Sequence, residues 1–120
     1  MKHTFAQFLI AAPASGSGKT TISIGMMAAL VRRGRVVQPF KCGPDYIDTK
    51  YHGMACHRSS YNLDLFMATD SHVKAIYSEA SRDADICVVE GMMGLFDGFQ
   101  RQQGSAAHVA ATLHLPVILV

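Results

Sequence analysis

A glycine-rich stretch near the N-terminus has the residue types that bind phosphate groups. Positions 12–21 read A-P-A-S-G-S-G-K-T-T, which nearly meets the pattern G-x-x-x-x-G-K-[ST], with Pro13 in place of the first glycine. Glycines let backbone N–H groups turn toward an anion, the lysine supplies a positive charge, and the next hydroxyl is placed to bind Mg²⁺. The sequence therefore predicts binding of ATP or GTP with magnesium. The expected nucleotide-binding residues are Ser15, Gly16, Ser17, Gly18, Lys19, Thr20 and Thr21.

Two further segments carry carboxylates directly after apolar stretches. They read K-C-G-P-D-Y-I-D at 41–48 and E-G-M-M-G-L-F-D-G at 90–98. Because the carboxyl ends of parallel strands share one edge with a phosphate loop, we expect these segments to converge on the triphosphate. A carboxylate that closes an apolar strand, as Glu90 does, suits magnesium, whereas Asp45 and Asp97 also fit a simple role in turns. The residues expected to converge are Lys41, Asp45, Asp48, Glu90 and Asp97.

Histidines and cysteines indicate no second chemistry. His52, Cys56 and His57 match no zinc-binding spacing, so we expect structural or surface roles for them. The three cysteines form no C-x-x-C pair and none lies in G-x-C-x-G, so this chain has no candidate glutaminase nucleophile. Reduced thiols are expected.

The elements that must position these residues alternate along the chain. Four apolar runs predict strands at 5–12, 36–41, 86–90 and 117–120. Three helical patterns predict helices that begin at Lys19, after a cap at Asp70 or Ser71, and after a cap at Ser105. Long loops are expected at 42–62 and 91–104, and a short helical turn at 63–67. This order predicts a three-layer α/β fold with a mainly parallel sheet.

Each predicted helix has one apolar face that we expect to pack on the sheet, and a stop signal at Gly34 ends the first of them. The expected inward residues are Ile22, Met26, Ala29 and Leu30 in the first helix, Val73, Ile76, Tyr77 and Ala80 in the second, and Ala106, Val109, Ala110 and Leu113 in the third.

Composition limits the classes of protein. The 120 residues are 49% hydrophobic and 17% charged, which suits one small domain or part of one. A net charge of +2 does not indicate nucleic-acid binding, and the arginines at 32, 33 and 35 fit a helix C-terminus. No apolar run is long enough to span a membrane and no signal peptide is indicated, so we expect a cytoplasmic protein. Because the chain stops within an apolar strand, we expect 1–120 to be the N-terminal portion of a larger domain.

Four motifs taken together resemble the cobyrinic acid a,c-diamide synthase family. They are G-S-G-K-T-T at 16–21, Q-P-F-K-C-G-P-D-Y-I-D at 38–48, N-L-D at 62–64 and E-G-M-M-G-L-F-D-G at 90–98. The resemblance runs from about residue 8 to residue 120. It implies a P-loop domain, similar to dethiobiotin synthetase, that activates carboxylates with ATP, followed by a glutaminase domain that is absent from this chain. The implied substrate is cobyrinate or hydrogenobyrinate, amidated at its a and c acetate side chains.

The resemblance also assigns roles. It implies that Lys19 neutralises the transferring phosphoryl group and that Lys41 stabilises an acyl phosphate. The aspartates would orient metal, intermediate or ammonia. The implied catalytic residues are Lys19, Lys41, Asp45, Asp48 and Asp97, and the implied Mg²⁺ ligands are Thr20, Glu90 and Asp45.

Three alternatives stay open at this point. Sister amidases, namely cobyric acid synthase or the enzyme that amidates nickel-sirohydrochlorin, share the motifs. A partition-type switch ATPase is a second class, although Ala14 stands where that class carries a signature lysine. The chain is also compatible with an inactive fragment, and with either a monomer or a homodimer.

Overall fold

A parallel β-sheet forms the centre of the molecule. The computed structural model describes residues 6–16, 18–98 and 103–120. Within these ranges the sheet has the strand order β3-β2-β4-β1-β5, and every pairing is parallel. The strands are β1 (Ala6–Ala11), β2 (Val37–Cys42), β3 (Tyr61–Leu63), β4 (Ile86–Glu90) and β5 (Val117–Leu119).

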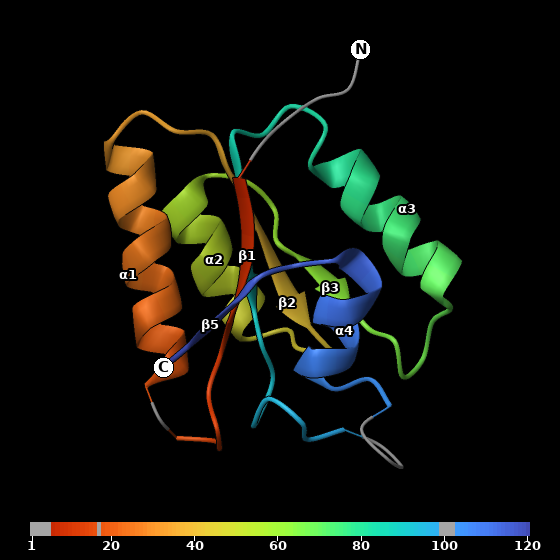
Figure 1. Cartoon of the computed structure of the whole chain (residues 1–120). Coiled ribbons are helices and arrows are strands. Elements are labelled where there is room, and N and C mark those ends of the chain that lie inside the picture. The colour runs from red at the N-terminus through yellow and green to blue at the C-terminus, as the bar shows by residue number, and fades with distance from the viewer. Residues whose placement is uncertain (1–5, 17, 99–102) are drawn as a thin grey trace.

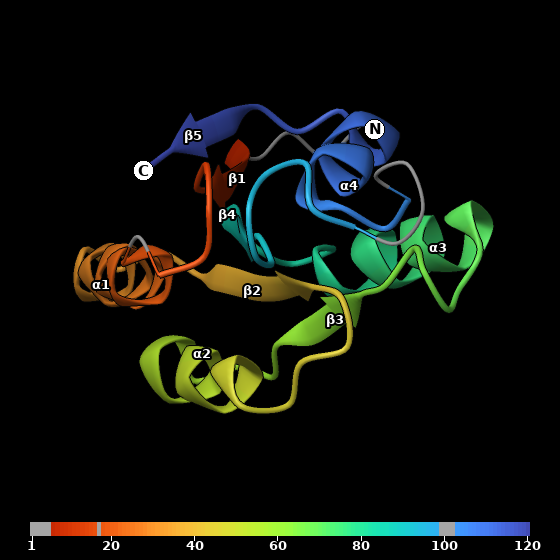
Figure 2. The ribbon, with the colours of Figure 1, turned by 90° about the horizontal axis from the view of Figure 1, so that it is seen from below.

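Helices cover both faces of this sheet. Figures 1 and 2 show α1 and α2 on one face and α3 and α4 on the other. The arrangement confirms the predicted three-layer α/β architecture. The helices are α1 (Lys19–Arg32), α2 (Asp48–Cys56), α3 (Asp70–Ala80) and α4 (Ala106–Leu113).

Alternation along the strands divides the core into two parts. Leu9 and Val89 face α3 and α4, whereas Ile10 and Val88 face α1 and α2, because successive side chains of a strand point to opposite faces. The ring of Phe40 is fully buried on the α3 side and lies 4.7 Å from that of Tyr77. Both faces of the central strands are therefore apolar, as expected for a covered parallel sheet.

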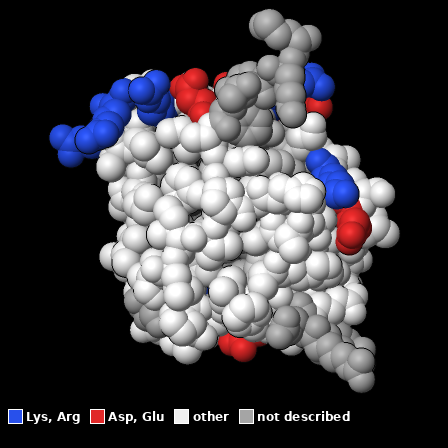
Figure 3. Space-filling model, viewed as in Figure 1, with Lys and Arg blue, Asp and Glu red and all other residues white. Residues whose placement is uncertain are grey.

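Several predicted boundaries are confirmed. Strand β4 has the expected bounds, α1 begins at Lys19, and Gly34 follows its end with a φ of 82°. The hydroxyl of Ser105 accepts a hydrogen bond from the backbone N–H of His108 and so caps α4. The basic cluster lies at the C-terminal end of α1, and Figure 3 shows basic side chains gathered over that corner. Phe5, the predicted start of the first strand, lies outside the described residues.

The largest correction concerns residues 42–62, which we predicted as a loop. The segment contains α2 and β3. Helix α2 has no continuous apolar stripe, because its two buried residues are His52 and Cys56. The short helical turn predicted at 63–67 forms one residue later, because Leu63 belongs to β3: the N–H of Ala68 donates to the carbonyl of Asp64 at 3.0 Å.

Two predictions about the helices were also wrong. The buried stripe of α1 is centred on Ser23 and Met27, whereas Ile22 is 40% exposed and Ala29 is exposed as well. Ser23 tolerates burial because its hydroxyl donates to the carbonyl of Lys19 at 2.8 Å. Helix α3 is capped by Thr69 rather than by Asp70 or Ser71.

The topology brings the polar segments to one edge. The phosphate loop leaves β1, the 42–48 segment leaves β2 and the 91–98 segment leaves β4, all at the carboxyl ends of parallel strands. These strands are neighbours, with β4 between the other two.

Within the described ranges, every helix is too short or too polar to cross a lipid bilayer.

Candidate active site at the carboxyl edge of the sheet

The phosphate loop wraps the start of α1. Gly16 and Gly18 have φ values of 80° and 84°, a left-handed conformation that favours glycine, and Gly18 is the N-cap of α1. The first N–H groups of α1 therefore point out of the helix toward the loop, where an anion binds readily. Ser15 and Thr21 are exposed at this end of the helix, and Ser17 lies outside the described residues.

Lys19 and Thr20 turn from α1 toward the end of β4. Lys19 is only 8% exposed, and its Nζ donates to the backbone carbonyl of Met93 at 2.7 Å. The hydroxyl of Thr20 donates to Oε2 of Glu90 at 2.8 Å. Two consecutive helix residues thus join the phosphate loop to the segment that follows β4.

Glu90 is the centre of the site. It is fully buried and its Cα is in register with those of Ile10 in β1 and Lys41 in β2. Its Oε2 receives the Thr20 hydroxyl and lies 3.1 Å from Nζ of Lys41. Its Oε1 lies 2.7 Å from Nε2 of His52. These three partners come from α1, β2 and α2.

Lys41 is surrounded by carboxylates. It is 4% exposed, and besides Glu90 its Nζ donates a hydrogen bond to Asp48 and lies 3.4 Å from Asp45. Burial opposes the charge on Lys41, but the hydrogen bond to Asp48 and the three negative charges outweigh burial and raise its pKa. Lys41 therefore stays charged and holds the acids of two loops together.

Asp45 and Asn62 shape the segment after β2. Oδ1 of Asp45 accepts the backbone N–H groups of Ile47 and Asp48, each at 2.9 Å, and so sets the start of α2. Burial opposes ionisation of Asp45, but these N–H groups and Lys41 outweigh it and lower its pKa. Oδ1 of Asn62 in β3 accepts the N–H of Asp45 at 3.2 Å. The N-L-D motif thus supports the loop.

The surroundings lower the pKa of both Lys19 and Glu90, which disfavours the charged form of Lys19 and favours the charged form of Glu90. Burial and the charge of Lys41 lower the pKa of Lys19. Burial disfavours the charged form of Glu90 as well, yet the hydrogen bond from His52, the charge of Lys41 and the hydrogen bond from Thr20 hold its pKa well below the ordinary value. No carboxylate in the described ranges lies within ion-pair distance of Lys19. A buried cation that faces a neutral carbonyl is well suited to an anionic ligand.

The oxygen donors where Thr20 of α1 meets Glu90 of β4 fit magnesium. Thr20 and Glu90 offer a hydroxyl and a carboxylate oxygen 2.8 Å apart. Within the described part of the chain, no three His, Cys, Asp or Glu side chains gather in a metal-binding arrangement. A small number of hard oxygen ligands, completed by water and phosphate oxygens, is the environment that Mg²⁺ prefers.

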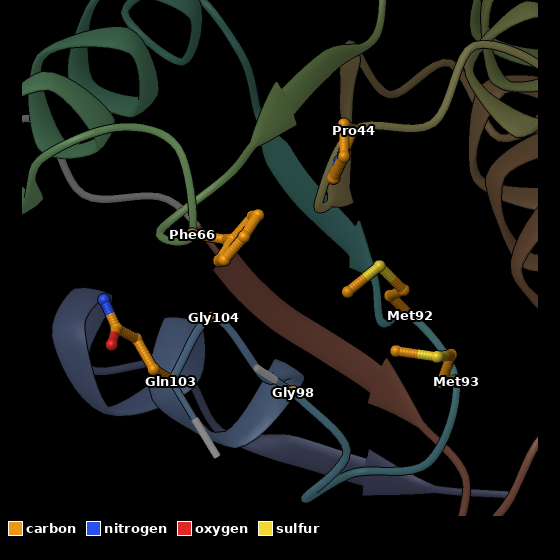
Figure 4. A pocket seen from close by; sticks show the side chains of 7 residues that line it. All are labelled: Pro44, Phe66, Met92, Met93, Gly98, Gln103 and Gly104. Carbon is orange, nitrogen blue, oxygen red and sulfur yellow. The ribbon is translucent and has the colours of Figure 1, made fainter. Parts of the chain in front are cut away.

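An apolar pocket lies next to this polar cluster. Its volume is about 290 Å³, and Figure 4 shows side chains from the ends of β2, β3 and β4 pointing into it. Met93 links the two features, because its side chain lines the pocket and its carbonyl receives Lys19. The lining residues are Pro44, Phe66, Met92, Met93, Gly98, Gln103 and Gly104.

Comparison with known proteins identifies the family. Residues 8–120 match the family described as the CobQ/CobB/MinD/ParA nucleotide binding domain. The chain belongs to this family. It is 55% identical over 114 residues to the cobyrinate a,c-diamide synthase of Picrophilus torridus, covering 93% of this chain and 26% of that protein. It is 50% identical over 114 residues to the hydrogenobyrinate a,c-diamide synthase of Brucella ovis, covering 94% of this chain and 26% of the relative. The chain thus spans about a quarter of the length of these curated relatives.

This nucleotide binding domain gathers most of the residues expected from the sequence. Thr20, Lys41, Asp48 and Glu90 form one continuous set of contacts, and Asp45 joins it through Lys41. Lys19, next to Thr20 in α1, donates instead to the carbonyl of Met93. Asp97 has a different position: its Oδ2 accepts the N–H of Gly94 at 2.9 Å and holds the loop that follows β4.

The sequence did not indicate that His52 touches the site. A structural or surface role was expected for it; the surface role is wrong, because His52 is fully buried and contacts the central carboxylate of the site. Asp48 and His52 are four residues apart, so in a helix both lie on one face. That spacing would have revealed His52 had α2 been predicted.

Gly94 provides a test of the contact between the two loops of the nucleotide binding domain. A Cβ at this position would lie 2.5 Å from the carbonyl oxygen of Pro13 and 2.8 Å from Oδ2 of Asp97. We expect Gly94→Ala to lower the free energy of unfolding by ~1–3 kcal/mol, because well-packed backbone must shift. Urea unfolding of the natural protein measures this change.

The matched control is Gly25→Ala in α1, where a Cβ meets nothing within 4 Å. An exposed helical glycine gains ~0.5–1 kcal/mol of stability on this change. We also expect Gly94→Ala alone to weaken nucleotide binding, because Pro13 begins the phosphate loop. Equal unfolding midpoints for the two variants would contradict the close packing at Gly94.

Proposed function

We propose that the natural protein containing this chain amidates the a and c side-chain carboxylates of a cobyrinate-type corrinoid at the expense of ATP, by way of an acyl phosphate. One observation carries the proposal. Oε2 of Glu90 joins the phosphate-binding residue Thr20 to the charged cluster around Lys41. A phosphoryl donor and an anionic acceptor bound at this edge would therefore meet at one place. The names of the relatives support the a,c-amidation of a cobyrinate-type corrinoid.

The nucleotide would bind along the phosphate loop. The N–H groups at the start of α1 and the ammonium of Lys19 face the position of the phosphates. Mg²⁺ would be held by Thr20 and Glu90, with Asp45 as a further candidate, and when bound it would offset negative charge on the phosphate oxygens. ATP rather than GTP is proposed on the resemblance of the four motifs.

Two steps then form the amide. An oxygen of the substrate carboxylate attacks the γ-phosphorus and ADP leaves. Ammonia attacks the carbonyl carbon, and phosphate leaves with the former carboxylate oxygen. Lys19 would neutralise the transferring phosphoryl group, and Lys41 the acyl phosphate. Asp45, Asp48 and Asp97 would orient the intermediate or the incoming ammonia, which a glutaminase domain would release from glutamine.

The apolar pocket fits an edge of such a substrate. A corrinoid carries ionised acetate groups on a ring rich in methyl groups, so it needs an apolar surface next to a site for carboxylates. At about 290 Å³ the pocket holds only an edge of so large a ring. Met92 and Met93 have flexible side chains that adapt to an irregular apolar ligand, and Phe66 adds a large apolar surface.

An isotope experiment tests the acyl phosphate. The natural protein is supplied with ATP, Mg²⁺, ammonia and cobyrinate that carries ¹⁸O in its carboxylates. We expect one ¹⁸O atom in the inorganic phosphate for each amide formed, because that oxygen attacked the γ-phosphorus. Label in AMP would indicate an adenylate and would contradict the mechanism.

Two parallel reactions separate the competing functions. Nickel-sirohydrochlorin replaces cobyrinate in one of them, and a higher kcat/KM there would assign the sister amidase. The other contains ATP without acceptor. Dimerisation dependent on ATP, with no transfer of label in any reaction, would favour the switch ATPase.

A further inference from the structure

A buried histidine touches the site but has no part in the chemistry proposed above. His52 is fully buried in α2. Its Nε2 lies 2.7 Å from Oε1 of Glu90 and its Nδ1 lies 2.9 Å from the hydroxyl of Ser60. Both ring nitrogens thus have a partner, and the ring is held in one orientation.

The two contacts have a defined direction. An ionised carboxylate only accepts hydrogen bonds, so Nε2 of His52 carries the hydrogen that Glu90 receives. In a neutral imidazole with hydrogen on Nε2, Nδ1 is an acceptor, and the hydroxyl of Ser60 donates to it. Glu90 therefore fixes the tautomer of His52, and the hydroxyl of Ser60, which can donate, fits it.

The two carboxylate oxygens of Glu90 have different partners. Oε1 accepts the hydrogen bond from His52, while Oε2 lies 2.8 Å from the hydroxyl of Thr20 and 3.1 Å from Nζ of Lys41. The terminal torsion of a glutamate side chain is soft and rotates over a broad range. A donor fixed on one oxygen stops that rotation and keeps the other oxygen at the edge where the phosphate loop ends.

We propose that His52 is a positioning residue for binding of the magnesium nucleotide: His52 keeps Oε2 of Glu90 turned toward Thr20 before the ion binds. The inference rests on the magnesium part of the proposed function. Partners that orient a metal-binding carboxylate typically change metal affinity by about 10–100-fold when removed. The nucleotide itself is held by the phosphate loop, so its affinity without the ion is expected to be independent of His52.

Two substitutions of similar size each retain a different one of the two hydrogen bonds of His52. In His52→Gln, the amide nitrogen reaches the place of Nε2 and still donates to Glu90. In His52→Asn, the shorter side chain reaches only the place of Nδ1, so the contact with Ser60 is retained and the contact with Glu90 is lost. Both variants lack the imidazole ring: His52→Gln keeps the hydrogen bond to Glu90, and His52→Asn keeps the hydrogen bond to Ser60.

The readout is binding of a fluorescent ATP analogue to the natural protein, in EDTA and then along a Mg²⁺ titration. We expect His52→Asn to raise the Mg²⁺ midpoint by about 10–100-fold and to leave affinity in EDTA within about 2-fold of the original protein. We expect His52→Gln to stay within about 3-fold at every Mg²⁺ concentration. A general loss of structure would lower affinity in EDTA too.

Three outcomes would overturn the inference. They are an unchanged Mg²⁺ midpoint in His52→Asn, equal shifts in both variants, and an original protein whose nucleotide binding does not respond to Mg²⁺. Only the third also removes magnesium from the proposed function. If His52→Asn does not fold, Ser60→Ala is measured instead, because Ser60 is only partly buried. We expect that variant to raise the midpoint by about 3-fold or more, and no change there would overturn the inference.

Discussion

Lys19→Ala in the natural protein is expected to abolish amidation with either glutamine or free ammonia as the nitrogen source. Removal of one charged group that stabilises a transferring phosphoryl typically costs about 10²–10³-fold in rate. We expect the upper end of this range, because no carboxylate in the described ranges pairs with Lys19 and its charge is available to the phosphates. Steady-state assays with each nitrogen source measure the effect. The loss should be the same for both sources, since Lys19 acts before ammonia enters.

The control is Lys74→Ala, which removes an exposed lysine from α3 on the opposite face of the sheet. It should leave both rates within about 2-fold, since an isolated exposed charge has little effect. Lys19→Ala should still fold, because the bond that it removes ends on a backbone carbonyl near the edge of the sheet. A near-normal rate with ammonia would remove Lys19 from the transfer step.

The two lysines of the site have different surroundings, which indicates different tasks. Lys19 faces a carbonyl, whereas Lys41 contacts Asp45, Asp48 and Glu90. An ion placed between Thr20 and Glu90 would compete with Lys41 for Oε2 of Glu90. The ammonium of Lys41 would then be free to turn toward the carboxylate of an acceptor. This exchange gives a physical reason for two lysines at one edge.

The sequence was most informative where local pattern and chemistry agree. The glycines of the phosphate loop, the helix that starts at Lys19 and the apolar strand that ends at Glu90 all carry strong local signals, and each is found as predicted. The convergence of Lys41 with Glu90 followed from topology alone, because their strands are parallel neighbours in direct register.

The segment between β2 and β3 could not be read in the same way. Helix α2 buries a histidine and a cysteine and exposes Ile47 and Met54 at its margins, so it lacks the apolar periodicity of a surface helix. His52 can be buried because Glu90 and Ser60 satisfy both of its nitrogens. The hydrogen bond to Nε2 depends on Glu90, which is 38 positions away, so no local sequence pattern reveals that His52 can be buried.

Glu90→Gln is expected to have the second large effect, and it acts on magnesium. The amide keeps the shape of the side chain and can still accept from His52, so the fold should survive. It removes the negative charge that the ion needs, and we expect the Mg²⁺ midpoint for nucleotide binding to rise by about 100-fold, the upper end of the range for altered metal sites. The amidation rate should fall by about 10²-fold even at saturating Mg²⁺. Glu79→Gln is the matched control, because Glu79 is exposed on α3.

The same variant gives a test by pH. The surroundings of Glu90 lower its pKa from the ordinary 4.5 to about 2 in the folded protein. A lowered pKa stabilises the fold above about pH 4.5, and that contribution is lost as the pH falls toward 2. Glu90→Gln should therefore be less stable than the original protein near pH 7, and the difference should shrink in acid. An unchanged Mg²⁺ titration would remove Glu90 from the metal site, whereas a stability difference that is constant from pH 7 to pH 2 would contradict the buried, ionised carboxylate on which the site depends.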